Sequence, residues 1–289
     1  MLFRSHNFHY RPLWQPDKIL YDNSRTAVVM EDWYTHKDPR QFYYGSYVQA
    51  RAKLQEVSES NYAFFDKRNM AGRMSDEVKE KIIRCLLPLR HAELGANMNN
   101  MFACSYGTAT VVTQGFLFNA MDRLGIAQYL SRIGLLLDGN SGESLTAAKE
   151  AWMVDPAWQG IRRYIENVFC LEDWFEVFIA QDVVLDTLVY DLMYDQFDQA
   201  ISDAGGSDLA MLIEFMQVWH KDTSRWVDSV LKITAAESDH NRELISSWVA
   251  DWKEKAVTDL APLAEIAVGE EAINASIDVL QKRLAKAGL

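Results

Sequence analysis

A series of long helical patterns, separated by short turns that contain glycine, most constrains what this chain can fold into. Apolar residues recur at helical spacing in each pattern, and no convincing strand pattern lies between them. A Ser75-Asp-Glu-Val sequence is a cap-like helix start, and a helix break is expected at Pro262. The predicted helices cover about 47–69, 75–114, 116–139, 156–169, 172–202, 207–255 and 270–287. Several helices this long predict one all-α bundle with a shared core.

The N-terminal segment has a different character. Residues 8–44 hold three of the six prolines and many aromatic residues, without helical periodicity. Because the residue before a proline favours extended backbone, this segment is predicted to be an extended arm. Its aromatic residues must pack either on the helices of this chain or on a partner subunit. We therefore expect an arm over 1–44, of which 1–5 are non-native, and a helical domain over 45–289.

Charge and cysteine content exclude several classes of function. The formal net charge of −12 argues against nucleic acid and anionic membrane surfaces, since both need a basic face. No apolar run approaches the length that spans a bilayer. The three cysteines are far apart and form no metal-binding or disulfide pattern, which favours a reducing, cytoplasmic location.

The stretch "AESDHNRE" contains Glu237 and His240, three residues apart. On a helix this spacing places both side chains on one face, and a Glu-x-x-His pair is part of a carboxylate-bridged di-iron site. Such a site takes one Glu from each of two helices and a Glu-x-x-His from each of two others. Glu93 and Glu176 supply the two single glutamates, since both lie among apolar or small neighbours. The alternative for Glu237 and His240 is a pair that faces the solvent.

The remaining helix has no Glu-x-x-His. Its Arg123 instead points along a small, mostly apolar face, where a guanidinium needs anions as partners. We expect Arg123 to project toward Glu93, Glu176 and Glu237 and to replace the charge of a metal pair. The alternative is an arginine that extends to the end of the bundle. Asp182 and Asp186 could pair with arginines, but their spacing favours a solvated helix face.

Six stretches carry a resemblance to a known family. They are "NFHYRPLWQPDKILYD", "DPRQFYYGSYVQARAK", "PLRHAELGANMNN", "MDRLGIAQYLSRIGLLLDGNSGE", "DPAWQGIRRYIE" and "GGSDLAMLIEFMQVW". They closely resemble the β subunit of the multicomponent bacterial phenol hydroxylases, which belong with the toluene, alkene and soluble methane monooxygenases. The resemblance extends from about residue 7 to 263.

The resemblance implies a ferritin-like helical fold and a non-catalytic role. In this family an α subunit carries the di-iron centre, and the hydroxylase assembles with γ subunits as (αβγ)2. Electrons come from NADH through a reductase with FAD and a [2Fe–2S] cluster, and a regulatory protein also binds. No cofactor is expected in this chain, whose vestigial di-iron positions would be Glu93, Arg123, Ile126, Glu176, Glu237 and His240.

Two alternatives and one further expectation follow from the resemblance. The chain could itself be a di-iron oxidase or oxygenase with a non-standard ligand set, or an iron-storing protein. Both alternatives lack a ligand near Ile126. In the scaffold interpretation the arm lies across the α subunit, with Trp14, Tyr43 and Tyr44 as contact residues.

Overall fold

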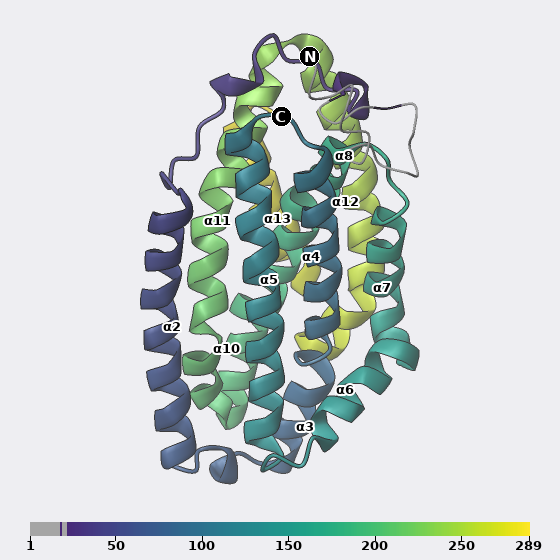
Figure 1. Ribbon diagram of the computed structural model, residues 1–289. Coiled ribbons are helices and arrows are strands. Elements are labelled where there is room, and N and C mark those ends of the chain that lie inside the picture. The colour runs from purple at the N-terminus through teal and green to yellow at the C-terminus, as the bar shows by residue number, and fades with distance from the viewer. Residues whose placement is uncertain (1–17, 19–21) are drawn as a thin grey trace.

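The computed structural model describes Lys18 and residues 22–289, and every regular element in that part of the chain is helical (Figure 1). The predicted all-α bundle is therefore confirmed. The α-helices are α2 (Tyr44–Lys67), α3 (Asp76–Cys85), α4 (Leu89–Tyr106), α5 (Thr110–Leu137), α6 (Glu143–Val154), α7 (Pro156–Val168), α8 (Trp174–Phe178), α9 (Asp186–Tyr190), α10 (Phe197–Ile201), α11 (Ala210–Glu237), α12 (Asp239–Ala267) and α13 (Ala272–Ala287). None of these helices is long and apolar enough to cross a membrane.

The long helices run roughly along one axis. In the view of Figure 1, α4 and α5 lie side by side at the front, with α2 at one edge and α7 toward the other. The interior is rich in large aromatic side chains, and Trp158, Trp174, Trp219 and Trp226 are fully buried. The abundance of tryptophan is thus explained in large part by the core, where each such ring removes a large apolar area from water.

Side chains cap the first turns of several helices, and the cap at Ser75 was predicted. The Ser75 hydroxyl accepts the Val78 amide at 3.3 Å, which caps α3. Asp173 accepts the amides of Phe175 and Glu176 at 2.8 and 3.2 Å, so it caps α8. These caps satisfy amides that have no partner inside the helix.

The prediction of one helix over 207–255 is wrong. The backbone is extended at Ser238, where α11 ends, and the Ser238 side chain caps α12 by accepting the Asn241 amide at 3.1 Å. The expected break at Pro262 is also wrong, because α12 continues through this residue. Leu260 and Leu263 are fully buried on either side of the proline. Packing in the core therefore offsets the roughly 3 kcal/mol that an internal proline costs.

The predicted helix over 172–202 is present but irregular. Two π-helical segments, η5 (Ile179–Leu185) and η6 (Asp191–Gln196), alternate with α8, α9 and α10. A π turn holds an extra residue, so it shifts the register of the side chains that follow. Such turns occur frequently at functional sites in helices.

The described part of the arm, residues 22–43, is called the strap below. It contains two short 3-10 turns, Asn23–Arg25 and Trp33–Thr35, and leads directly into α2. In Figure 1 the strap crosses the end of the bundle where α11 meets α12. Trp14 and residues 1–5, for which predictions were made, lie outside the described residues.

Candidate functional site

A single arginine lies at the centre of a buried cluster of acids. Arg123 of α5 is only 1% exposed. Its Nη1 donates to Glu93 Oε2 at 3.1 Å, and its Nη2 contacts Asp186. Asp182 Oδ1 lies 3.8 Å from the same Nη2. The prediction that Arg123 points inward to buried acids is right for Glu93, and the alternative of an arginine extended to the end of the bundle is excluded.

Aromatic side chains form the walls of this cluster. The Tyr190 hydroxyl donates to Glu93 Oε1 at 2.9 Å and lies 3.3 Å from Arg123 Nη1. The guanidinium carbon of Arg123 is 4.5 Å from the ring centroid of Trp219, a cation–π distance. These contacts fix the plane of the guanidinium.

Amide side chains complete the hydrogen bonds of the acids. Asn100 and Asn119 both donate to Asp182 Oδ1, at 3.1 and 2.8 Å. Gln181 donates to Asp186 Oδ1 at 2.8 Å. Asp182 and Asp186 are 2% and 4% exposed, so the predicted solvated face is wrong. Gln181 and Asp182 lie in the π turn η5, which directs both side chains into the interior. Regular helical spacing could not have predicted this burial.

The electrostatics of the cluster follow from burial. Burial and, to a smaller extent, the neighbouring Asp186 raise the pKa of Asp182 to about 8. Burial also raises the pKa values of Glu93 and Asp186, although Arg123 opposes both shifts. The acids hold the pKa of Arg123 well above its usual value, against the effect of its own burial. One fixed cation therefore faces three carboxyl groups, of which Asp182 keeps its proton at neutral pH.

This arrangement does not fit a pair of iron ions. The guanidinium occupies the space between the acids, and the fully buried Ile126, one turn along α5, has no atom that binds a metal. Glu176 is half-buried and accepts a hydrogen bond from Trp252 Nε1 at 2.9 Å instead of facing Arg123. Within residue 18 and residues 22–289, no three His, Cys, Asp or Glu side chains form a group that could hold a metal ion.

Glu237 and His240 are not part of the buried cluster, and their exposure agrees with the solvent-facing alternative. Both are exposed, and neither contacts Arg123; each contacts the backbone of the strap. Glu237 Oε1 accepts the Glu31 amide at 2.8 Å, and His240 Nε2 lies 3.2 Å from the carbonyl oxygen of Ala27. The helix break at Ser238 explains the difference, because the predicted common face assumed one continuous helix.

Two residues that the sequence did not single out complete this strap contact. The buried Asn241 accepts the Val29 amide at 3.0 Å and donates to the Val29 carbonyl at 2.8 Å. Asp173 Oδ2 accepts the Ala27 amide at 2.7 Å. Side chains thus hold every second residue of an extended segment. The Ser238-Asp239 pair, which resembles a helix cap, was the signal that could have located the break.

Aromatic anchors hold the next part of the strap on this chain. Trp33 packs on Trp174, with ring centroids 5.2 Å apart, and is 9% exposed. His36 is buried with its Nε2 2.9 Å from Thr234 Oγ1, and burial lowers its pKa. Tyr43 and Tyr44, by contrast, are 66% and 72% exposed. The strap therefore packs on the helices of this chain, whereas the rings of Tyr43 and of Tyr44, the first residue of α2, are exposed.

Comparisons with known proteins agree with this fold. A sequence model described as Methane/Phenol/Alkene Hydroxylase matches residues 14–238. The chain is 52% identical to "Phenol 2-monooxygenase, oxygenase component DmpL" of Pseudomonas sp. (strain CF600), over 98% of this chain and 86% of that protein. It is 22% identical to the "Toluene-4-monooxygenase system, hydroxylase component subunit beta" of Ectopseudomonas mendocina, over 82% of this chain and 74% of that one.

A solved structure gives the same result. A chain of the xenon-pressurized phenol hydroxylase from Pseudomonas sp. OX1 superposes with a TM-score of 0.94 and 46% identity, over 98% of this chain and 86% of that chain. The family match spans most of the sequence, and the 52% identity to DmpL extends over nearly the whole chain. The chain therefore belongs to the methane/phenol/alkene hydroxylase family.

Proposed function

We propose that this chain is the β subunit of the hydroxylase of a phenol-type aromatic monooxygenase, and that it is not itself catalytic. In this proposal it supports an iron-bearing α subunit in an (αβγ)2 assembly that hydroxylates aromatic rings with O2. The names of two relatives support it, since one is an oxygenase component of phenol 2-monooxygenase and the other a hydroxylase subunit beta.

The observation that carries the non-catalytic role is the position of Arg123. A guanidinium cannot be neutralised by losing its proton, so it is a permanent positive charge among Glu93, Asp182 and Asp186. It supplies the charge that a metal pair would supply in a bundle of this kind. With Ile126 beside it, the cluster is suited to stabilise the bundle and offers no open coordination position.

The same proposal assigns the cofactors to other chains. The iron pair belongs to α, while the reductase carries FAD and [2Fe–2S] and takes its electrons from NADH. The γ subunit, the regulatory protein and the reductase are the further partners, in the cytoplasm. The three free cysteines, Cys85, Cys104 and Cys170, are compatible with a reducing compartment.

A substitution at Glu93 tests whether this cluster is catalytic. Glu93→Gln should leave phenol hydroxylation per assembled hydroxylase within about twofold of wild type, because in this account the carboxylate binds only Arg123 and Tyr190. The hydroxylase would be purified with α and γ, and turnover would be normalised to intact complex. A loss of about a hundredfold or more per complex, typical of a lost catalytic group, would refute the non-catalytic role.

A further inference from the structure

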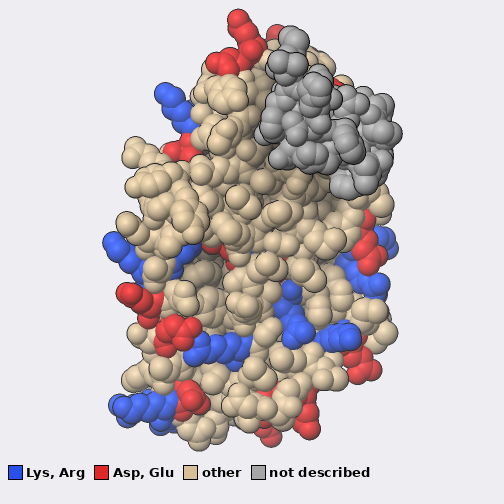
Figure 2. Space-filling view, viewed as in Figure 1, with Lys and Arg blue, Asp and Glu red and all other residues tan. Residues whose placement is uncertain are grey.

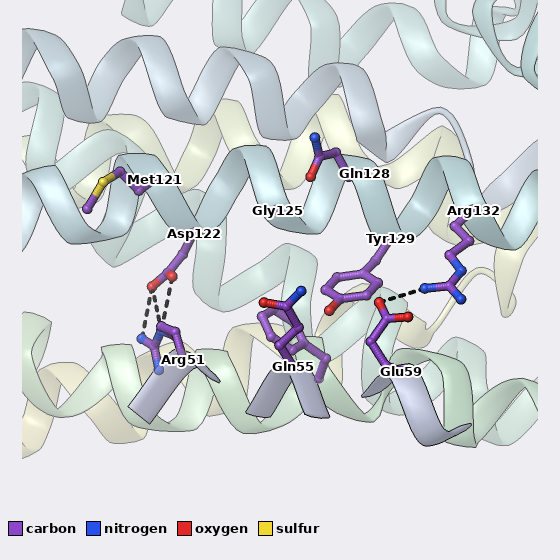
Figure 3. A pocket seen from close by; sticks show the side chains of 10 residues that line it. Arg51, Gln55, Glu59, Met121, Asp122, Gly125, Gln128, Tyr129 and Arg132 are labelled. Carbon is purple, nitrogen blue, oxygen red and sulfur yellow. Dashed lines mark hydrogen bonds and ion pairs between the residues drawn. The ribbon is translucent and has the colours of Figure 1, made fainter. Parts of the chain in front are cut away.

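The long helices α5 and α11 pack on each other inside the bundle, and two contacts fix their relative position. Trp219 Nε1 of α11 donates to Asp122 Oδ2 of α5 at 2.7 Å, and Asp122 also pairs with Arg51 of α2 (Figure 3). Farther along α11, Trp226 packs so closely on Gly115 of α5 that a Cβ at this glycine would clash with the indole ring. Between the two contacts residue numbers rise along α11 and fall along α5, so the two helices run antiparallel.

Asn119 of α5 and Thr223 of α11 lie about halfway between these two contacts. Asn119 is one turn from Gly115 and Thr223 is one turn from Trp226, so both are on the sides of the helices that face each other. They are 1% and 4% exposed. Figure 2, seen from the side where α4 and α5 are in front, shows a broad uncharged area at its centre, so these polar groups of α5 and α11 lie away from the surface.

Three buried polar atoms at this level have no hydrogen-bond partner among the residues that the structure describes. They are Asn119 Oδ1, Thr223 Oγ1 and Trp226 Nε1. The other end of the Asn119 amide is fully used, because Nδ2 donates to Asn100 Oδ1 and Asp182 Oδ1 at 2.9 and 2.8 Å. Since the amide group is planar, its oxygen is directed away from these partners on α4 and η5.

Other buried groups of the same kinds on α11 do have partners. Thr234 Oγ1 donates to the Val230 carbonyl at 2.9 Å, as a helical threonine commonly does, and Trp219 Nε1 has the carboxylate partner given above. Thr223 and Trp226 follow neither pattern. A buried polar group without a partner shifts the folding equilibrium toward the unfolded state by about five- to a hundredfold, and nearly all such groups bond to protein or to ordered water. Three of them in one place therefore indicate a ligand that they share.

The three atoms match the hydrogen bonds of one water molecule. An indole N–H only donates, an amide oxygen only accepts, and a hydroxyl does either. A water molecule accepts from the first, donates to the second and bonds to the third, and about three bonds are usual for a buried water. Groups one helical turn apart, about 5.4 Å, are spanned by two hydrogen bonds of about 2.8 Å each. A metal cation does not fit, because the Trp226 N–H presents a positive hydrogen, and an anion would be repelled by the Asn119 oxygen.

We propose that a water molecule is bound between α5 and α11, held by Asn119 Oδ1, Thr223 Oγ1 and Trp226 Nε1. The bound water fixes the Asn119 amide in the orientation in which Nδ2 donates to Asp182. It thereby extends the hydrogen-bond network of the buried cluster to α11. This inference concerns side chains of this chain alone and does not depend on the proposed function.

A crystal structure of the full chain, at a resolution that shows ordered water, tests the site directly. The expected result is a water peak within about 3.2 Å of both Asn119 Oδ1 and Thr223 Oγ1. Density without such a peak, or a direct hydrogen bond between the two side chains, would overturn the inference.

The variant Thr223→Val gives a second test, because the sign of its effect differs between the two cases. Valine has a similar shape but no hydroxyl, so a bound water would lose one partner, and urea unfolding should show a folding equilibrium lower by about tenfold. Thr258→Val is the matched control, since its exposed hydroxyl bonds to the Glu254 carbonyl of its own helix at 3.0 Å, and it should stay within about twofold of wild type. If Thr223 has no partner in the folded chain, Thr223→Val instead removes an unsatisfied group. An unchanged or higher folding equilibrium would therefore contradict the bound water.

Discussion

Replacement of Arg123 by leucine tests the buried cluster directly. The substitution removes the cation from three carboxyl groups that are each less than 5% exposed. Breaking a buried pair by removing one partner costs about 3–5 kcal/mol, because the remaining charge has no counter-charge. Arg132→Leu on the same helix is the control, since its partner Glu59 and its own side chain are 47% and 38% exposed. A surface pair of this kind contributes about 0–1 kcal/mol.

The free energy of unfolding of the isolated chain would be measured in urea at pH 5 and at pH 8, with circular dichroism as the signal. Without Arg123 the folded-state pKa values of the three acids rise further above their unfolded values. The folded state then binds more protons than the unfolded state, so its stability falls as the pH rises between these values. The loss in free energy of unfolding caused by Arg123→Leu should therefore be larger at pH 8 than at pH 5. A variant that unfolds like Arg132→Leu at both pH values would refute the cluster as the account describes it.

Two further predictions concern Asp182 and the strap. Asp182→Asn should stabilise the chain by a few kcal/mol more at pH 8 than at pH 5, because the folded pKa of about 8 lies above the unfolded value of about 3.9 and the wild-type chain loses stability as the pH rises through this interval. Thermal melts across this pH range would show it, and a parallel pH dependence of variant and wild type would contradict it. Asn241→Ala should free the strap, since it removes both hydrogen bonds to Val29 at a cost of about 1–3 kcal/mol. Hydrogen exchange of the Val29 amide should then speed up markedly, whereas His240→Ala, which loses one exposed contact, should change it little; equal exchange in both variants would show that Asn241 does not hold the strap.

The helical bundle could be predicted because most helices follow one period over many residues. The errors arise where packing overrides local preference. Pro262 lies inside α12 because its neighbours are fully buried, and sequence periodicity carries no information on that burial. The break at Ser238 depends on a single extended residue between two helices of matching pattern.

Part of the buried cluster could be predicted because it lies on helices with a regular period. Glu93 and Arg123 could be found because each interrupts a face of small or apolar residues in a regular helix. For Asp182 and Asp186 the alternative of pairing with an arginine of another helix is confirmed, whereas the favoured solvated face is wrong, because η5 changes the register of this helix. Glu237 was misplaced because the strap that it binds is distant in sequence, and no periodic pattern links the two.

The sequence alone did not determine which surface the aromatic residues of the arm contact. Its aromatic residues were expected to pack either on this chain or on a partner, and the structure divides them. Trp33 and His36 are buried on this chain, whereas Tyr43 and Tyr44 point to solvent. A contact of the two tyrosines with α stays a prediction.

The most direct test of the central claim, that this chain holds its fold with Arg123 in place of a metal pair, is iron content per chain. It would be measured on the chain purified alone after expression in iron-rich medium, and again on the complex with α. The account predicts no bound iron in the isolated chain and about two irons for each pair of α and this chain in the complex. Stoichiometric iron in the isolated chain, lost on substitution of Glu93, would contradict it.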